Sequence, residues 1–155
     1  MAKVRGFTIV ELLVVMTVLA ILATAALPLA ELTVRRSQER ELKLALREIR
    51  QAIDAYKKAL DDGRIASTPN QSGYPPSLEV LVTGVTDAKS AGSKLYFLRR
   101  IPRDPFAQLA DANVSPWGLR CFASPPENPK PGEDVYDIYS LNPGTGLNGI
   151  PYREW

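Results

Sequence analysis

A single carboxylate, Glu11, interrupts the most apolar stretch of this 155-residue chain. The stretch runs from Phe7 to Ala30, reads FTIVELLVVMTVLAILATAALPLA, and contains no other charged side chain. A charge near the centre of an apolar helix costs about 2–3 kcal/mol in a bilayer, so such residues are rarely kept without a role. Glu11 is therefore the first candidate functional residue.

Residue types that carry most catalysis are absent or isolated. The chain has no histidine, the commonest general base and transition-metal ligand, and its lone Cys121 cannot form an intramolecular disulfide. We interpret Cys121 as a small apolar residue of the interior. The adjacent pairs Asp61-Asp62 and Glu133-Asp134 fall in segments expected to be exposed, where neighbouring carboxylates rarely act as acid and base. No phosphate loop or metal-binding spacing is visible, so we expect neither an enzyme nor a metal site.

Arg99, Arg100 and Arg103 form a basic cluster in the second half of the chain. From Glu31 onward, however, 17 basic residues face 16 acidic ones, so this part is nearly neutral. A protein that coats nucleic acid is usually strongly basic, and we expect no nucleic-acid partner. We interpret the cluster as a solvated or subunit-pairing face.

The apolar stretch is long enough to cross a membrane. As a helix its 24 residues span about 36 Å, against about 30 Å for the hydrocarbon core of a bilayer. Lys3 and Arg5 precede it, which predicts a cytoplasmic N-terminus. A secretory signal peptide cut near Ala23-Thr24-Ala25 and a plain membrane anchor are the alternatives. Neither accounts for Glu11.

The residues at the start of the stretch resemble the prepilin signal of type IV pilins and type II secretion pseudopilins. They are Lys3-Val4-Arg5-Gly6 followed by Phe7-Thr8-Ile9-Val10-Glu11. The resemblance implies that a prepilin peptidase cuts between Gly6 and Phe7 and methylates the new N-terminal amine of Phe7. Residues 1–6 are then a leader peptide, and residues 7–30 are kept as a transmembrane helix and assembly segment.

The same resemblance implies a role for Glu11 in assembly. A buried amine and a buried carboxylate each cost several kcal/mol when alone, and they neutralise each other when paired. The Glu11 carboxylate of one subunit is therefore expected to pair with the Phe7 amine of a neighbour, which fixes the axial register of the two helices.

The helix is expected to continue beyond the membrane as an amphipathic segment over residues 31–63. Apolar residues recur at spacings of three and four on one face, and charged residues fill the other. The apolar positions are Leu42, Leu46, Ile49, Ile53, Tyr56 and Leu60, flanked by Ala45, Ala52 and Ala59. Gly63 is expected at the C′ position that ends the helix. Pro28 cannot donate to the carbonyl of Thr24, so a kink or a short melted stretch is expected there.

Residues 64–155 form a proline-rich C-terminal body, which holds 12 of the 13 prolines. This density predicts turns and short strands. We predict a short helix over 77–82 with Ser77 as N-cap, strands over 95–98 and 135–140, and a weaker strand over 117–122. The predicted fold class is α+β, in which a long N-terminal helix packs against a small antiparallel sheet.

Two stretches of the body are similar to the major pseudopilin of type II secretion systems. They are GYPPSL at 73–78 and YFLRRIPRDPF at 96–106, and VYDIYSL at 135–141 matches the last strand of that family. Members usually carry acidic calcium ligands in the next loop. Here this loop, Asn142 to Gly149, contains no carboxylate, so we expect poor calcium affinity and no cofactor.

The resemblance implies a pseudopilin of the bacterial inner membrane, with a single-pass anchor and a periplasmic body. Its expected partners are identical subunits and other pseudopilins in a periplasmic filament, the prepilin peptidase, the lipid bilayer, and an inner-membrane assembly platform with its ATPase. Two alternatives stay open. One is a major or minor subunit of a type IV pilus, and the other is a minor pilin that binds DNA or a surface.

Overall fold

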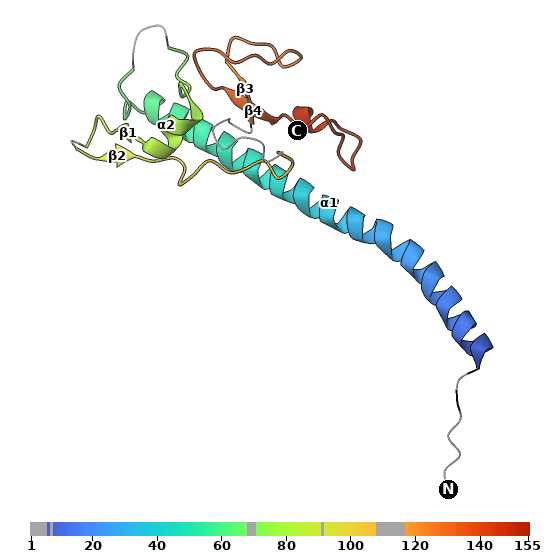
Figure 1. Ribbon diagram of the computed structural model, residues 1–155. Coiled ribbons are helices and arrows are strands. Elements are labelled where there is room, and N and C mark those ends of the chain that lie inside the picture. Colours follow the sequence, from blue (N-terminus) through green and yellow to red (C-terminus); the bar gives the residue numbers. More distant parts are fainter. Residues whose placement is uncertain (1–5, 7, 68–70, 91, 108–116) are drawn as a thin grey trace. The chain divides into compact units, whose positions relative to one another are not determined.

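The computed structural model describes residues 6, 8–67, 71–90, 92–107 and 117–155, with the backbone alone at 25–27. Figure 1 shows the elements along the chain: helices α1 (Ile9–Asp61) and α2 (Leu78–Thr83), strands β1 (Val85–Thr86), β2 (Lys94–Leu95), β3 (Trp117–Arg120) and β4 (Asp137–Ser140), and a final 3-10 turn, η1 (Tyr152–Glu154). The chain divides into two compact units, Met1–Ser37 and Gln38–Trp155, and α1 begins in the first and ends in the second.

Helix α1 joins the predicted transmembrane and amphipathic segments into one element. It continues through Pro28, so the short melted stretch considered for this position is not seen, and a kink there stays a prediction. Pro28 removes the hydrogen bond to the carbonyl of Thr24, and the nearby threonine hydroxyls donate to other carbonyls of the helix. The Thr24 hydroxyl donates to the carbonyl of Ile21 at 2.7 Å, and that of Thr33 donates to the carbonyl of Leu29 at 2.9 Å.

The end of α1 follows the prediction. The N–H of Gly63 donates to the carbonyl of Leu60 at 2.9 Å and that of Arg64 to the carbonyl of Ala59 at 2.8 Å, which together form a Schellman motif. Gly63 has φ 69°, a left-handed conformation that glycine adopts without steric cost. Two carboxylates near this negative helix end are offset by lysines one turn earlier, in the pairs Lys57–Asp61 and Lys58–Asp62.

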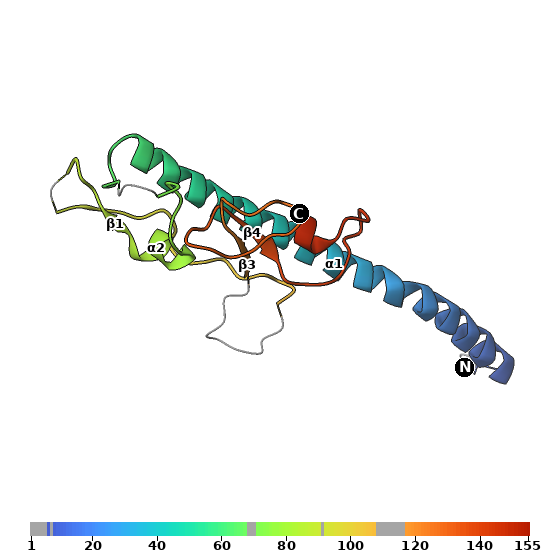
Figure 2. The ribbon, with the colours of Figure 1, turned by 90° about the horizontal axis from the view of Figure 1, so that it is seen from above.

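The apolar stripe on the second half of α1 forms the centre of the core. All of its predicted members are buried except Leu60, which is half-buried: Leu42, Ala45, Leu46, Ile49, Ala52, Ile53, Tyr56 and Ala59. Leu78 and Leu81 of α2 and Ile138 of β4 belong to the same buried cluster. Figure 2 shows α2 and the β3–β4 pair beside this half of the helix.

The strands form two separate antiparallel pairs. β1 pairs with β2 and β3 with β4, with Val85 opposite Leu95 and Leu119 opposite Ile138. The α+β class is confirmed. The strand predicted over 95–98 is shorter than expected, because the N–H groups of Phe97 and Leu98 both donate to the carbonyl of Leu81 in α2. That same contact places the segment before Arg99 against α2.

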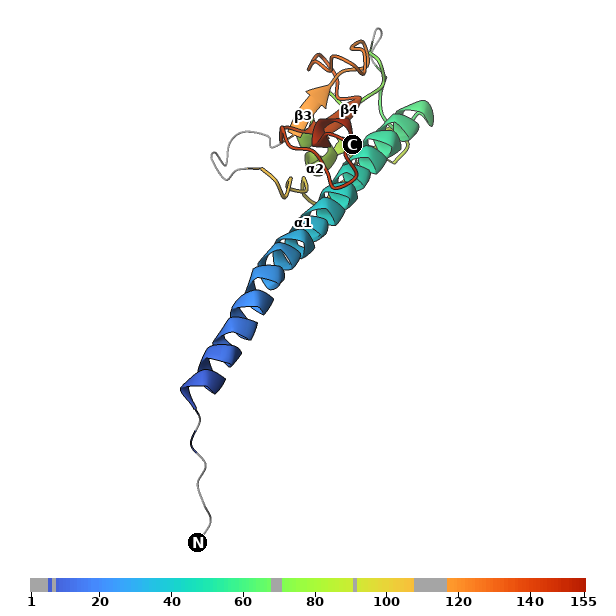
Figure 3. The ribbon, with the colours of Figure 1, turned by 90° about the vertical axis from the view of Figure 1, so that its right-hand side faces the viewer.

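The β3–β4 pair has one face in the core and one face outward. Ile138 and Ser140 are fully buried, and Asp137 and Tyr139, which alternate with them along β4, lie on the other face, as the period of a strand requires. Gly118 of β3 allows close approach here, because a Cβ at this position would lie 2.3 Å from the Tyr139 ring. Figure 3 shows the pair and the C-terminal segment beside α1.

Candidate assembly site

Helix α1 begins with a reciprocal capping box formed by Thr8 and Glu11. The Thr8 hydroxyl oxygen accepts the N–H of Glu11, and one Glu11 carboxylate oxygen accepts both the N–H and the hydroxyl of Thr8, all at 3.2 Å. Two of the four N–H groups that a helix start leaves unbonded are satisfied in this way. In the single chain, therefore, Glu11 is already held in one orientation at the positive end of the helix.

Phe7 lies outside the described residues, so its distance to Glu11 is not given by the structure. Gly6 is described and exposed, as a peptidase would require of a cleavage junction. The cleavage between Gly6 and Phe7, the methylation of Phe7 and the pairing of Phe7 with Glu11 stay predictions.

Hydroxyls of the apolar helix are satisfied within the helix itself. Besides Thr24 and Thr33, the Thr17 hydroxyl donates to the carbonyl of Leu13 at 2.8 Å. A hydroxyl without a partner is costly in hydrocarbon, and a bond to the preceding turn removes that cost. Glu11 is left as the one charged side chain from Thr8 to Ala30.

The first part of α1 is long and apolar enough to cross a membrane, judged by length and composition. The described side chains of this apolar stretch contribute nothing to the core, because none of them is buried within the structure. Large side chains such as Ile9, Val10 and Ile21 are more than half exposed. A surface of this kind is stable only in lipid or against other apolar helices.

Residues 1–27 match the prokaryotic N-terminal methylation motif. The motif is the prepilin signal of type IV pilin-like proteins, and it covers both the Gly6-Phe7 junction and Glu11. Neither the curated proteins nor the solved structures gave a match. The motif and the exposed apolar helix together fit a membrane-anchored, single-pass subunit that assembles with other pilin-like subunits.

The loop after β4 is closed by side chains of the chain itself. Glu39 of α1 is buried, and its Oε1 accepts the N–H of Leu147 at 2.7 Å and the hydroxyl of Tyr152 at 3.0 Å. Asn142 accepts the N–H of Gly144 at 2.7 Å, and Asn148 accepts that of Ile150 at 3.1 Å. The side-chain oxygens of both asparagines are thus engaged in turns, and the described residues contain no cluster of acidic or thiol side chains that could hold a metal ion.

The Arg99, Arg100 and Arg103 cluster lies on an exposed segment, and within the described part of the chain its members form no ion pair. The segment is fixed by Asp104, which is buried and accepts the Ser140 hydroxyl at 2.5 Å and the N–H of Phe106 at 2.8 Å. The aspartate of the RDPF sequence therefore fastens the segment to β4.

The remaining candidates have structural roles. Cys121 is half-buried, and its Sγ would lie 2.8 Å from a Cβ at Gly132, so close packing leaves little space around the thiol. Asp61 and Asp62 pair with lysines, and Asp134 accepts the N–H of Phe122 at 2.8 Å. None of these arrangements resembles an acid–base site.

Sequence reasoning missed three of these roles. The Thr8-to-Glu11 spacing is the pattern of a capping box and could have been recognised. Glu39 precedes the apolar stripe by one turn and gave no local signal, because its partners are more than 100 residues away. Asp104 belongs to the segment 96–106 that resembles the major pseudopilin, but its contact with Ser140 depends on the tertiary fold.

Proposed function

We propose that this protein is a structural pseudopilin of a type II secretion system, which assembles through its N-terminal helix into a periplasmic filament that drives protein export. It acts as a subunit and has no enzymatic activity, and a partner ATPase on the inner-membrane platform supplies the energy. The observation that carries the proposal is the methylation motif, followed by an apolar helix whose side chains are exposed throughout the described part of residues 8–34.

Several features favour the secretion branch over a surface pilus. The 96–106 segment resembles the major pseudopilin, and it is anchored to the last strand through Asp104. Surface pilins often carry a C-terminal disulfide loop, which Cys121 alone cannot form. The near-neutral body gives no support to a DNA-binding minor pilin.

The proposed filament needs no calcium. The loop that holds the ion in major pseudopilins is here satisfied by Glu39, Asn142 and Asn148. Calcium binding requires several free oxygen ligands, which usually include carboxylates, and this loop contains no carboxylate side chain.

Substitution of Glu11 tests the assembly mechanism. Glu11→Gln removes the charge and keeps a side chain suited to a capping box, so the helix start is retained. We expect the protein to be processed and inserted as before, and to lose assembly, because each Phe7 amine is then buried without its counter-ion at a cost of several kcal/mol. The measurement is the ratio of sheared filaments to membrane-bound protein on a blot.

Two matched variants separate charge pairing from helix capping. Thr8→Val removes the capping hydroxyl and leaves the charge, and Glu31→Gln removes a carboxylate elsewhere on α1. Both should assemble close to the normal yield. Normal filaments from the processed Glu11→Gln protein would refute the pairing, and assembly loss in Thr8→Val equal to that in Glu11→Gln would assign the effect to the cap.

A further inference from the structure

The outward face of the β3–β4 pair forms the floor of a pocket of about 530 Å³. Asp137 and Tyr139 of β4 and Arg120 of β3 line this floor. The walls come from α1, from the loop after β3 and from the C-terminal segment, and include Arg50, Pro126, Glu127, Pro129, Arg153 and Trp155. The pocket lies wholly within the unit Gln38–Trp155.

Around Asp137 the pocket has more positive than negative charge, because Arg50 of the wall and Arg120 of the floor both face this carboxylate. Arg50 donates through Nε to Asp137 Oδ1 at 2.7 Å and through Nη2 to the carbonyl of Ile138 at 3.1 Å. Arg120 Nη2 is 3.9 Å from the other oxygen of Asp137, and its buried Nε has no hydrogen-bond partner in the part of the chain that the structure describes. One carboxylate thus faces two guanidinium groups, and an unbonded buried donor of this kind is costly.

The rim of the pocket carries charges of both signs. Arg153, its neighbour Glu154 and the loop residue Glu127 all line the pocket and are exposed, and none of the three forms an ion pair among the described residues. A small free anion would meet two carboxylates on its way in. A polypeptide surface that presents carboxylates beside basic and apolar side chains fits the rim better.

The exposed side of α1 carries such a surface. Glu41, Leu44 and Glu48 follow one another at spacings of three and four, so they form one stripe, which we call the Glu-Leu-Glu stripe. Leu44 is 64% exposed, although Leu42, Ala45 and Leu46 beside it belong to the core. Both glutamates are exposed and have no ion-pair partner within the described ranges. Arg47 is exposed next to Glu48 and provides the opposite charge.

We propose that this pocket binds the Glu-Leu-Glu stripe of a second copy of this chain. The carboxylate of Glu48 pairs with Arg153 on the rim, Leu44 packs on Pro126 and Pro129, and Arg47 beside the stripe meets Glu127 and Glu154. The inference rests on the filament proposed above, since it describes a contact between neighbouring subunits.

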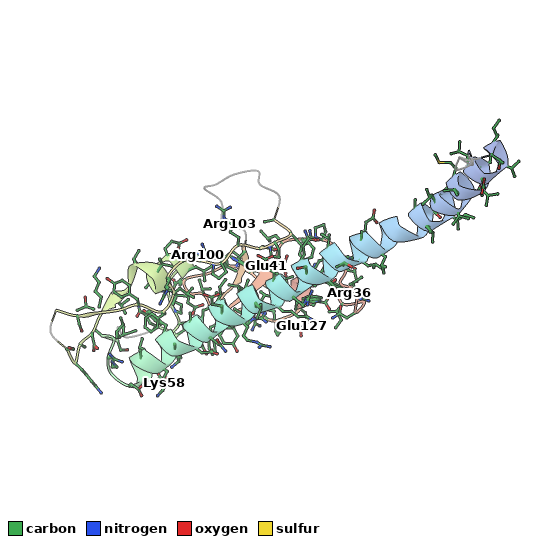
Figure 4. The ribbon with its side chains drawn as sticks, turned by 90° about the horizontal axis from the view of Figure 1, so that it is seen from below. Arg36, Glu41, Lys58, Arg100, Arg103 and Glu127 are labelled. Carbon is green, nitrogen blue, oxygen red and sulfur yellow. The ribbon has the colours of Figure 1, made fainter. Side chains whose placement is uncertain are left out.

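The position of the two surfaces makes the contact propagate. Arg50, in the pocket wall, follows Glu41 by about two and a half helical turns, so the two residues lie on opposite sides of α1. Figure 4 shows Glu41 and the rim residue Glu127 at opposite edges of the helix. A contact between two different surfaces of one chain leaves a free surface at each end, and repeated copies build an open helical array.

Charge reversal with rescue tests the contact in the full-length protein. Glu48→Arg and Arg153→Glu are suitable because both side chains are exposed and neither takes part in the Asp137 network. We expect each single reversal to lower the ratio of filament to membrane-bound protein about tenfold, through repulsion at every repeat. The double variant restores opposite charges and should recover most of the yield. Glu79→Arg and Lys94→Glu are matched reversals at exposed positions elsewhere, and they should assemble normally.

Cross-linking reads the same contact directly. In a Cys121→Ser background, chains with Glu48→Cys and chains with Arg153→Cys are co-expressed with different tags and oxidised in membranes. A mixed dimer is expected, and neither chain should cross-link when expressed alone. The variant Val14→Cys, in the apolar anchor, serves as a control that measures how often disulfides form through random encounters of two anchors in the membrane.

The outcomes separate this inference from the proposed function. Filaments from the wild type, with no effect of either reversal and no mixed dimer, would overturn the inference and leave the filament intact. A mixed dimer without any filaments would support the contact and contradict the proposed function. A double reversal that does not rescue assembly would also count against the pairing of Glu48 with Arg153.

Discussion

Asp87 is a buried carboxylate whose charge is retained through its partners. It is only 3% exposed, and it accepts two hydrogen bonds from Arg64, at 2.5 and 3.2 Å, and one from the N–H of Lys89 at 3.0 Å. The hydrogen bonds from Arg64 and from the N–H of Lys89 lower the pKa of Asp87 below its usual range, and the hydrogen bond to Asp87 raises the pKa of Arg64. The ion pair joins the end of α1 to the segment after β1.

This pair predicts how stability depends on pH. Because the folded-state pKa of Asp87 is below its unfolded value of about 3.9, the unfolded chain binds the proton more readily in acid. The stabilisation from Asp87 is present above that value and is lost as the pH falls through the lower, folded-state pKa. We expect Asp87→Asn to melt earlier than the wild type at pH 7 and to show a weaker dependence below about pH 4. Thermal melts in detergent from pH 7 to pH 2 measure this, with the exposed Glu79→Gln as the control.

Asp104 provides a second residue-scale prediction. Asp104→Ala leaves the buried Ser140 hydroxyl and the N–H of Phe106 without their acceptor, and an unsatisfied buried group costs about 1–3 kcal/mol. We expect a clearly lower free energy of unfolding. The neighbouring Arg103→Ala, at an exposed position, should change it by no more than about 0.5 kcal/mol. Equal effects of the two variants in denaturant titrations would contradict the assigned role of Asp104.

At the scale of elements, local pattern predicted α1 far better than the strands. The apolar residues of α1 recur at a regular spacing over the whole amphipathic segment, and Gly63 supplies a stop signal that depends only on local backbone geometry. β1 was missed because Val85 and Thr86 are too few to show any alternation. The predicted strand over 95–98 was cut short by bonds to Leu81, a tertiary contact that no local pattern encodes.

The loop after β4 gives an element-scale prediction that separates hydrogen bonding from metal binding. Glu39→Gln should weaken the bond to the N–H of Leu147, so hydrogen exchange at this amide should become faster, with a smaller change for buried Ile138 in the sheet. EDTA should leave the melting temperature of the wild type nearly unchanged. A large loss of stability with EDTA, reversed by added calcium, would show that the loop does bind the ion.

At the scale of the whole molecule, the N-terminal signal predicts that the mature protein lacks residues 1–6. We expect the membrane-bound form to have the mass of residues 7–155 plus one methyl group, because the resemblance of residues 3–11 to a prepilin signal implies cleavage after Gly6. Intact-mass spectrometry of the extracted protein measures this, and Gly6→Leu, which blocks the junction, should keep the leader. A mature N-terminus at Ala26 would instead indicate an ordinary secretory signal peptide.

The threonines of α1 have a mechanical consequence. Thr17, Thr24 and Thr33 donate their hydroxyls to their own helix, so the anchor offers a neighbouring helix mainly dispersion contacts. Such contacts have little directional preference, and their energy changes gradually when one rod slides along another. In the proposed filament, one anchor helix would then slide along its neighbour with little resistance, except where Glu11 forms its proposed ion pair. A bundle of such helices in that filament would therefore lengthen or twist under load, and the pairing proposed for Glu11 would return it to one preferred spacing when the load is removed.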